Sequence, residues 1–347
     1  MTKEQIIEKL SLTEPDSIKA LYEQANKVKN DTIGNKVYLR GLIEFSNICG
    51  KNCYYCGIRH DNKDVIRYEL SDEQVLEAVD FAWKNHYGSV VLQSGELTSA
   101  HFTKRITDLL HKIKELTNNE VGVTLSCGEQ TAETYRQWFN AGAHRYLLRI
   151  ETSNRELYHK LHPNNAKHSF DRRLDAIRYL REEGYQVGTG VMIGLPFQTI
   201  ENLADDLLFF QSMNVDMVGM GPYLEHDQTP LYQYNNLLLP PEKRLELGLK
   251  MVATLRLLMP DINIAATTAL QVLHPTGREQ AIRAGANVFM PNITPGTFRN
   301  QYLLYNNKPC TTESADECND CVDFRIKLAD SEIGYDQWGD SKHFQKK

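Results

Sequence analysis

Short β-rich runs alternate with longer helical patterns along this 347-residue chain, from residue 38 onward. Eight runs rich in apolar and β-branched residues predict strands. They cover residues 38–46, 89–94, 121–126, 145–151, 185–195, 216–224, 262–270 and 287–292. Several are continuously apolar, as a sheet covered by helices requires. Eight alternating β/α units predict an α/β fold, a (β/α)8 TIM barrel, whose chemistry lies at the carboxyl ends of its strands.

The segments between the strands carry helix signals. Ser71 and Gln74 have the spacing of a capping box, and a Pro pair at 240–241 precedes another helical run. We expect an N-terminal helical extension over residues 1–36, the barrel over 37–294, and a C-terminal layer with little regular pattern over 295–347.

Charge and hydropathy limit the partners of the chain. Its 39 Lys and Arg and 45 Asp and Glu give a formal net charge of −6, and no run of five basic residues occurs. This argues against nucleic acid as a partner. No eighteen consecutive apolar residues occur, and the N-terminus carries scattered charges. The sequence therefore predicts a soluble cytoplasmic protein without a membrane partner.

The seven cysteines are grouped in an unusual way. Six form two trios, Cys49, Cys53 and Cys56 near the start and Cys310, Cys318 and Cys321 near the end, while Cys127 stands alone. An odd number in tight trios favours metal ligation in a reducing compartment over a disulfide framework.

The first trio, spaced C-x3-C-x2-C, follows the first predicted strand directly. Three sulfurs alone do not close a tetrahedral zinc site, although His60 remains open as a fourth ligand. A cubane 4Fe-4S cluster held by three thiolates keeps one iron free for an outside ligand.

This spacing, with Tyr55 before the last cysteine and in the first loop of a barrel, resembles the radical S-adenosylmethionine (SAM) superfamily. The resemblance implies that the open iron chelates SAM. It also implies that an electron from the reduced cluster cleaves the sulfonium to give a 5′-deoxyadenosyl radical. The protein then supplies binding, orientation and exclusion of water.

Other strand ends fit the same resemblance. Ser94, Gly95 and Glu96 resemble the superfamily motif at the methionine ammonium. The resemblance places Glu151 on the SAM ribose and Arg173 on the methionine carboxylate. It places Gly190 and Gly194 against the adenine, with Tyr55 packing beside it. Taken singly, these residues also have ordinary interpretations: a turn, a helix-entry acid or a surface arginine.

A closer resemblance is to the HydE family of FeFe-hydrogenase maturases. It extends from IEFSNICGKNCYYCGIRHDN through VVLQSGE, RYLLRIETSN and GLPFQT to AATTAL and NVFMPNITP. The second trio, spaced C-x7-C-x2-C, resembles the auxiliary iron-sulfur site of many HydE proteins, a 2Fe-2S or 4Fe-4S cluster. A surface zinc site or free thiols remain alternatives.

The HydE resemblance implies a substrate in the barrel: a mononuclear iron complex with CO, cyanide and a cysteine-derived ligand, on the way to the diiron subcluster of the H-cluster. Other maturases of the HydG and HydF type, and an electron donor such as ferredoxin or flavodoxin, are the implied partners. An anionic complex needs fixed donors. The candidate contacts are Arg149, Thr267, Thr268, Tyr302 and Tyr305, each of which also has an ordinary packing interpretation.

Three other functions stay open. A methylornithine synthase-like lysine mutase shares the barrel and first trio, whereas biotin synthase-like sulfur insertion needs more barrel cysteines than Cys127. A non-catalytic zinc or iron-sulfur sensor is the third. Four histidines around the fourth strand, His144, His159, His162 and His168, show no metal-ligand spacing and are interpreted as surface residues.

Overall fold

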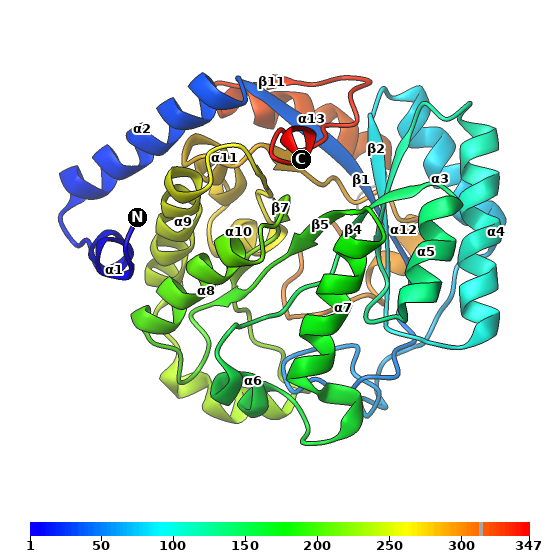
Figure 1. Cartoon of the computed structure of the whole chain (residues 1–347), viewed down its shortest axis with the longest axis horizontal. Helices are drawn as coiled ribbons and strands as arrows, with labels where there is room; N and C mark the ends of the chain where they lie inside the picture. Colours follow the sequence, from blue (N-terminus) through cyan, green and yellow to red (C-terminus); the bar gives the residue numbers. More distant parts are fainter. Residues whose placement is uncertain (312–314) are drawn as a thin grey trace.

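The computed structural model describes residues 1–311 and 315–347, without the side chains of 315–320. In this part of the chain, eight parallel strands follow one another in the order β10-β1-β2-β3-β4-β5-β7-β9. A parallel bridge between Ala265 and Val288 joins the two ends of this order. The sheet therefore closes into a barrel, with helices around it (Figure 1). The predicted fold class is confirmed.

The strands agree in position with the eight expected ones. They are β1 (Lys36–Ser46), β2 (Ser89–Ser94), β3 (Gly122–Ser126), β4 (Ala143–Leu147), β5 (Gln186–Thr189), β7 (Met217–Val218), β9 (Asn263–Ile264) and β10 (Val288–Phe289). The short strands β6 (Met192–Ile193) and β8 (Gly221–Pro222) pair with each other beyond β5 and β7.

Five expected strands are too long at their carboxyl ends: 145–151, 185–195, 216–224, 262–270 and 287–292. The expectation for 262–270 is wrong, because helix α10 (Thr268–Leu273) begins where that strand was to continue. A short apolar run has no periodicity that separates strand from buried helix, and Thr267 provides an N-cap residue. The fourth strand ends at Leu147, so Arg149 and Glu151 lie in the loop after it.

Helices cover the outside of the barrel. They are α3 (Asp72–Lys84), α4 (Ala100–Leu116), α5 (Ala132–Asn140), α6 (Arg155–Leu161), α7 (Phe170–Glu182), α8 (Ile200–Ser212), α9 (Pro241–Leu258), α10 and α11 (Gly277–Arg283), with 3-10 turns η1 (Ala166–His168) and η2 (Pro230–Leu237). The capping box of Ser71 and Gln74 is confirmed. In α4 the buried face contains Phe102, Ile106 and Leu109, a helical repeat that packs on the sheet.

The terminal segments add two layers. Helices α1 (Lys3–Leu10) and α2 (Pro15–Thr32) pack outside α8 and α9 (Figure 1). The C-terminal residues are more regular than expected, since α12 (Gly296–Arg299), α13 (Ala315–Leu328), β11 (Glu332–Ile333) and η3 (Phe344–Lys346) form there. Local sequence gave no sign of β11, because it is stabilised by parallel pairing with β1.

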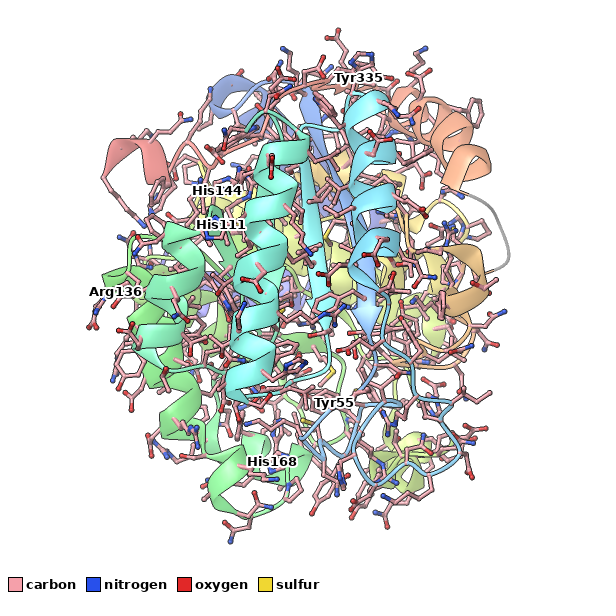
Figure 2. All side chains as sticks on the ribbon, turned by 90° about the vertical axis from the view of Figure 1, so that its right-hand side faces the viewer. Tyr55, His111, Arg136, His144, His168 and Tyr335 are labelled. Atoms are coloured by element: carbon pink, nitrogen blue, oxygen red, sulfur yellow. The ribbon has the colours of Figure 1, made fainter. Side chains whose placement is uncertain are left out.

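Residues 334–347, here called the C-terminal strap, cross the amino ends of the strands. The Asn263 amide donates to the Gly339 carbonyl at 2.8 Å, and the Ser341 N–H donates to Gln186 at 3.0 Å. Tyr335, in this strap, lies at one end of the molecule and Tyr55 lies toward the other (Figure 2). The strap therefore covers the end of the barrel opposite the cysteine loop.

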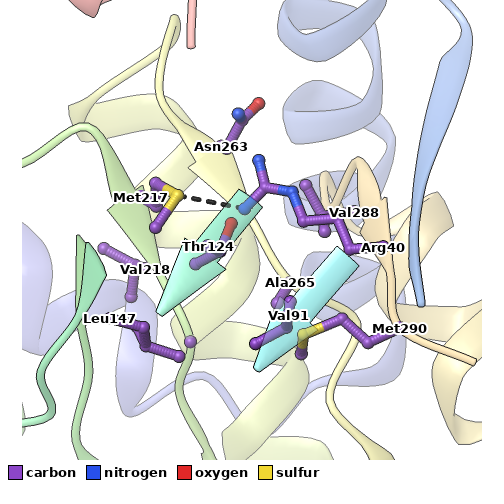
Figure 3. A pocket seen from close by; sticks show the side chains of 11 residues that line it. Arg40, Val91, Thr124, Leu147, Met217, Val218, Asn263, Ala265, Val288 and Met290 are labelled. Atoms are coloured by element: carbon purple, nitrogen blue, oxygen red, sulfur yellow. Dashed lines mark hydrogen bonds between the residues drawn. The ribbon is translucent and has the colours of Figure 1, made fainter. Parts of the chain in front are cut away.

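Behind the strap, the amino end of the barrel is filled by side chains. The buried Arg40 donates to the Met217 sulfur at 3.0 Å (Figure 3). It also donates to the Gly339 carbonyl at 3.2 Å. The cavity left there has about 30 Å³ and is mainly apolar. Space for a substrate is thus confined to the carboxyl end.

No helix among the described residues is long and apolar enough to cross a membrane.

Candidate functional site

The first cysteine trio lies in the loop between β1 and α3, at the carboxyl end of the barrel. Burial and the neighbouring charge of Cys49 raise the pKa of Cys53 to about 12. Burial and the charges of the other two cysteines also raise the pKa of Cys56. The sulfurs are therefore near enough to influence one another. Such thiols lose their protons when a metal binds.

The backbone around Cys49 is arranged for a bound sulfur. Its Sγ accepts the N–H of Lys51 at 3.4 Å and the N–H of Glu96 at 3.3 Å, which joins the loops after β1 and β2. Such N–H groups stabilise a thiolate ligand and tune the potential of an iron-sulfur cluster.

The surroundings of the trio do not form a closed single-ion site. Among the described residues, no three His, Cys, Asp or Glu side chains come together around one metal position. The exposed His60 instead pairs with Asp61 at 2.9 Å, so the zinc alternative lacks its fourth ligand. Three thiols without a fourth protein ligand suit a 4Fe-4S cluster with an open iron.

Beside the cysteine loop, Lys51, Glu96, Glu129 and Arg173 form a cluster of four charges, here called the buried charge cluster. The Lys51 Nζ lies 2.8 Å from Glu129 Oε2 and 3.0 Å from Glu96 Oε1. The Arg173 guanidinium lies 2.5 Å from Glu129 Oε1 and 3.6 Å from Glu96 Oε2. Two cations thus face two carboxylates with little solvent access.

The pKa values of the two acids in the buried charge cluster shift in opposite directions. Burial raises the pKa of Glu96. Burial also opposes ionisation of Glu129, but Arg173 and Lys51 outweigh it and lower the pKa of that carboxyl. Glu96 and Arg173 are predicted by the sequence, whereas Lys51 and Glu129 are not. The position of Glu129, three residues after β3, was the available signal.

A second pair lies after β4. Glu151 adopts a φ of 69°, and its N–H donates to the Gly190 carbonyl at 3.0 Å. Its carboxylate lies 3.0 Å from the Arg149 guanidinium. Burial raises the pKa of Glu151, although Arg149 and Arg173 oppose the shift. A left-handed conformation in a non-glycine residue is held by its surroundings and often marks a functional position.

Two of the histidines interpreted as surface residues are in fact buried: His162 and His168. The ring of His162 stacks on Tyr158 at 4.0 Å and meets the Tyr55 hydroxyl at 3.4 Å. His168 Nε2 accepts the N–H of Asn52 at 2.9 Å. Their burial depends on contact with the cysteine loop, which is distant in sequence and leaves no local pattern.

The hydrogen bonds of His168 indicate its tautomer, and burial determines the protonation state of both rings. Because His168 Nε2 accepts a hydrogen bond from Asn52, the proton of the neutral ring is on Nδ1, which donates to Asn165 Oδ1 at 2.8 Å. Burial lowers the pKa of His162 to about 3 and that of His168 to about 4. Both rings are neutral at physiological pH, and they hold the cysteine loop without adding charge. His144 is only half-buried, and its burial with the charge of Arg145 lowers its pKa to about 3.

Two adjoining cavities open beside the cysteine loop. The outer cavity, of about 110 Å³, is bordered by Tyr55, Cys56 and Glu151 among others. The inner cavity, of about 160 Å³, extends into the barrel toward Glu44 and Lys308. Five residues line both: Arg149, Thr267, Ala269, Leu304 and Tyr305. The two cavities therefore form a path from the first trio into the barrel.

The candidate substrate contacts lie mostly on this path. Arg149, Thr267 and Tyr305 line both cavities, and Thr268 lines the inner one. Tyr302 lies buried behind the wall, where its hydroxyl accepts the Gln93 amide at 3.3 Å.

The inner wall holds charged residues that sequence analysis missed. Lys308 Nζ lies 2.6 Å from Glu44 Oε1, and Asn292 donates to the same carboxylate at 3.0 Å. Glu44 is an acid between the apolar residues Ile43 and Phe45 near the carboxyl end of β1, which is a signal that periodicity alone overlooks. Arg278 also lines this cavity. Among the described lining residues, three cations thus stand against the single carboxylate of Glu44.

The small residues of the predicted SAM motifs have structural roles that the model shows. A Cβ on Gly95 would lie 2.4 Å from the Ile48 carbonyl oxygen, and one on Gly190 would lie 2.0 Å from the Gly219 oxygen. Ser94 Oγ donates to the Gly95 carbonyl at 2.8 Å, and the Gly194 N–H donates to Gln198 at 2.7 Å. Contact of these residues with SAM stays a prediction.

The structure describes the side chains of two cysteines of the second trio, Cys310 and Cys321. Cys310, with a φ of 59°, lines the inner cavity, whereas Cys321 is exposed on α13 and accepts the Arg325 Nε–H at 3.2 Å. The side chain of Cys318 lies outside the described residues. An auxiliary cluster here stays a prediction.

Comparison with known proteins is consistent with this geometry. The family model of the radical SAM superfamily matches residues 43–210. The chain is 43% identical to the [FeFe] hydrogenase maturase subunit HydE of Thermotoga maritima, over 98% of this chain and 94% of that protein. It is 29% identical to 3-methylornithine synthase of Methanosarcina acetivorans, over 80% of this chain and 76% of that one.

Solved structures show the same fold. A crystal structure of methylornithine synthase matches with a TM-score of 0.80 and 26% identity, covering 96% of this chain and 94% of the other. The FeFe-hydrogenase maturase HydG matches with a TM-score of 0.78 and 21% identity, over 96% and 72% of the two chains, and is similar in fold alone.

Proposed function

Because the chain belongs to the HydE-type hydrogenase maturases of the radical SAM superfamily, and is therefore a radical SAM enzyme, we propose that its substrate is an anionic iron complex. The complex would carry CO, cyanide and a cysteine-derived ligand, and would be converted in the barrel during assembly of the diiron subcluster of the H-cluster. The radical SAM family brings a 4Fe-4S cluster and SAM as cofactors, and Cys49, Cys53 and Cys56 would hold the cluster.

When bound, this cluster would supply one electron for the cleavage of SAM to methionine and a 5′-deoxyadenosyl radical. The residues of the chain bind and orient SAM: Glu96 meets the methionine ammonium, Arg173 its carboxylate, and Glu151 the ribose hydroxyls. Glu129 and Lys51 fix Arg173 and Glu96 through the buried charge cluster. The filled amino end of the barrel helps exclude water from the radical.

The observation that carries the substrate proposal is the charge of the inner cavity. Its described wall presents Arg149, Arg278 and Lys308. Lys308 pairs with Glu44, and Arg149 pairs with Glu151 of the outer cavity, so Arg278 leaves a net positive charge beside the cavity that Cys56 lines. A cationic wall with hydroxyl donors from Thr267, Thr268 and Tyr305 suits an anionic complex whose ligands accept hydrogen bonds. Tyr302 would orient this wall through Gln93.

The partners follow from this chemistry. An iron complex must arrive from another maturase of the HydG type and leave toward a scaffold of the HydF type. A one-electron donor such as ferredoxin or flavodoxin must reduce the cluster. Cys310, Cys318 and Cys321 would hold an auxiliary iron-sulfur cluster that is separate from SAM cleavage.

Anaerobic reconstitution tests the proposal. We expect about four irons at the first trio and reductive formation of 5′-deoxyadenosine from SAM. Cys53→Ala should abolish both, whereas Cys318→Ala should leave most of the cleavage. The synthetic or HydG-made iron complex should then change its infrared bands with SAM and reductant. SAM cleavage without any effect on the complex would refute the substrate proposal alone.

The lysine mutase alternative is less well supported by the cavity. An amino-acid substrate needs a free carboxylate for its ammonium, yet Glu44, the only acid among the described residues of the inner wall, is paired with Lys308 and Asn292. Cys127 is fully buried, with its sulfur toward the Leu92 carbonyl, and lines neither cavity, so it offers no sulfur-donor site for biotin-type chemistry. If the enzyme converted lysine to an isomer of the same mass, this result would support the lysine mutase function instead.

A further inference from the structure

The surface beside the cysteine loop is hollowed in two places. One groove, of about 480 Å³, lies between Gly50, Ser99, Lys167 and Arg172. A second, of about 430 Å³, continues from Gly50 and Lys167 to His60. We name the two together the loop-side groove. It is distinct from the inner and outer cavities, with which it shares none of its described lining residues.

The loop-side groove lies close to the first trio. Lys51 and Glu96 line it, and their backbone N–H groups both donate to Cys49 Sγ. A group docked in the groove would therefore be separated from a cysteine ligand by one peptide unit and a hydrogen bond. In Figure 2, His168, on the turn that borders the groove, lies near Tyr55 at this end of the molecule.

The charge of this surface opposes that of the whole chain. The described lining of the groove contains the cations Lys51, Lys167 and Arg172 and the acids Glu96 and Asp61, although the protein has a formal net charge of −6. Lys167 and Arg172 are exposed and have no ion-pair partner among the described residues. The nearby acids Asp61 and Asp171 are paired with His60 and Arg155. Among the exposed charges of the described lining, Lys167 and Arg172 thus outnumber Asp61, and the groove surface is net positive.

We propose that the loop-side groove is the docking surface for an acidic one-electron carrier protein, with Lys167 and Arg172 as its electrostatic contacts. This inference rests on the proposed function, which requires an electron from outside. Electron-transfer encounters bury little area and form quickly, so they depend on complementary charge more than on apolar contact. The anionic surface around the flavin or iron-sulfur centre of the carrier would contact Lys167 and Arg172. This contact would place the centre of the carrier beside the backbone of Cys49.

Charge reversal with two kinds of reductant tests the proposal. The reconstituted enzyme and its K167E, R172E and K167E/R172E variants are assayed for SAM cleavage with dithionite and, separately, with reduced flavodoxin. We expect dithionite rates within about twofold of the native enzyme. With flavodoxin, the KM for the carrier should rise about tenfold in the double variant, equivalent to about 1.4 kcal/mol. Its dependence on salt should weaken.

Lys36→Glu provides the matched control, because Lys36 is an exposed lysine at the amino end of β1, away from the cysteine loop. It changes the net charge as K167E does but should leave the flavodoxin KM unchanged. Equal flavodoxin kinetics in all variants would overturn the docking proposal. The docking proposal would also be overturned if the groove variants lost hydrogenase maturation but kept normal flavodoxin kinetics. That result would indicate that another maturase binds the groove. No cleavage with dithionite in the native enzyme would instead refute the proposed function.

Discussion

At the residue scale, the candidate functional site contains buried charged side chains that form ion pairs with one another. Glu129 is 2% exposed and contacts both cations of the buried charge cluster. A buried ion pair contributes little net stability while intact, but removing one partner leaves an uncompensated charge. Glu129 thus acts through Arg173 and Lys51, as a positioning residue.

Glu129→Gln tests this role. Gln keeps the shape but cannot neutralise Arg173, so the guanidinium should shift from its SAM-binding position. We expect KM for SAM to rise about tenfold, with kcat reduced less and stability reduced by about 3 kcal/mol. Steady-state SAM cleavage with dithionite measures the effect. Glu133→Gln, at an exposed ion pair on α5, is the control. An unchanged KM in a folded variant would contradict the assignment.

Asp206 gives a pH dependence at the same scale. Its Oδ1 accepts both the N–H and the hydroxyl of Ser153 at 2.6 Å, which supports the loop after Glu151. Burial raises the pKa of Asp206 to about 7. The folded protein therefore binds this proton more tightly than the unfolded chain, and the contribution to stability is largest below about pH 4 and is lost as pH rises toward 7.

Asp206→Asn should remove that dependence. Between pH 5 and 7, the native protein should lose up to about 1.4 kcal/mol per pH unit from this group, and the variant should lose less. Anaerobic thermal unfolding across pH 5 to 7.5 measures the slopes. Asp108→Asn, at a surface ion pair on α4, should keep the native slope. Identical slopes in D206N and the native protein would show that Asp206 does not titrate in this range.

At the element scale, the carboxyl ends of the strands depend on close backbone contacts. β5 and β7 approach so closely beyond Thr189 that Gly190 has no room for a Cβ. In the same turn, the Gly190 carbonyl accepts a hydrogen bond from the Glu151 N–H. The site loops after β4 and β5 are thereby fixed to each other by backbone alone.

Gly190→Ala should separate these two strands. The added methyl would meet the Gly219 carbonyl oxygen at 2.0 Å, and overpacking against backbone costs about 1–3 kcal/mol. Gly219→Ala is the reciprocal control, since its Cβ would lie 3.7 Å from the Leu147 side chain, an ordinary contact. Thermal unfolding without SAM compares the two. Equal stability in both variants would contradict the close contact between Gly190 and the Gly219 carbonyl.

At the scale of the whole molecule, the C-terminal strap completes the barrel. Arg145 is fully buried and reaches Asp340 of the strap at 2.6 Å. Burial opposes ionisation of Asp340, yet His144 and Arg145 hold its pKa well below the usual value. Because this pKa is lowered, the contribution to stability is present above about pH 4 and is lost in acid.

Asp340→Asn should therefore destabilise the protein at neutral pH. We expect a loss of about 3–5 kcal/mol, because Arg145 and the nearby Arg40 lose their anion. SAM cleavage by the folded fraction should be retained, since the strap lies at the far end of the barrel. Asp336→Asn, at an exposed strap position with a φ of 58° that Asn tolerates, is the control. A native melting temperature in D340N would contradict this role of the strap.

Sequence periodicity was sufficient for the barrel and for the placement of its strands, because alternating apolar runs and capped helices are local signals. It failed at Thr268, where a short apolar run became helix, and at β11, which depends on pairing with β1. The boundaries of the three segments, 1–36, 37–294 and 295–347, stay predictions.

The sequence by itself determined the first cysteine trio and the strand ends that carry Glu96, Glu151 and Arg173, because spacing within a loop and position after a strand are written in the chain. Only the tertiary structure decided that Lys51 and Glu129 complete one cluster, that His162 and His168 are buried neutral supports, and that a strap closes the barrel. These contacts join residues distant in sequence, and their burial and charge balance exist only once the strands have closed.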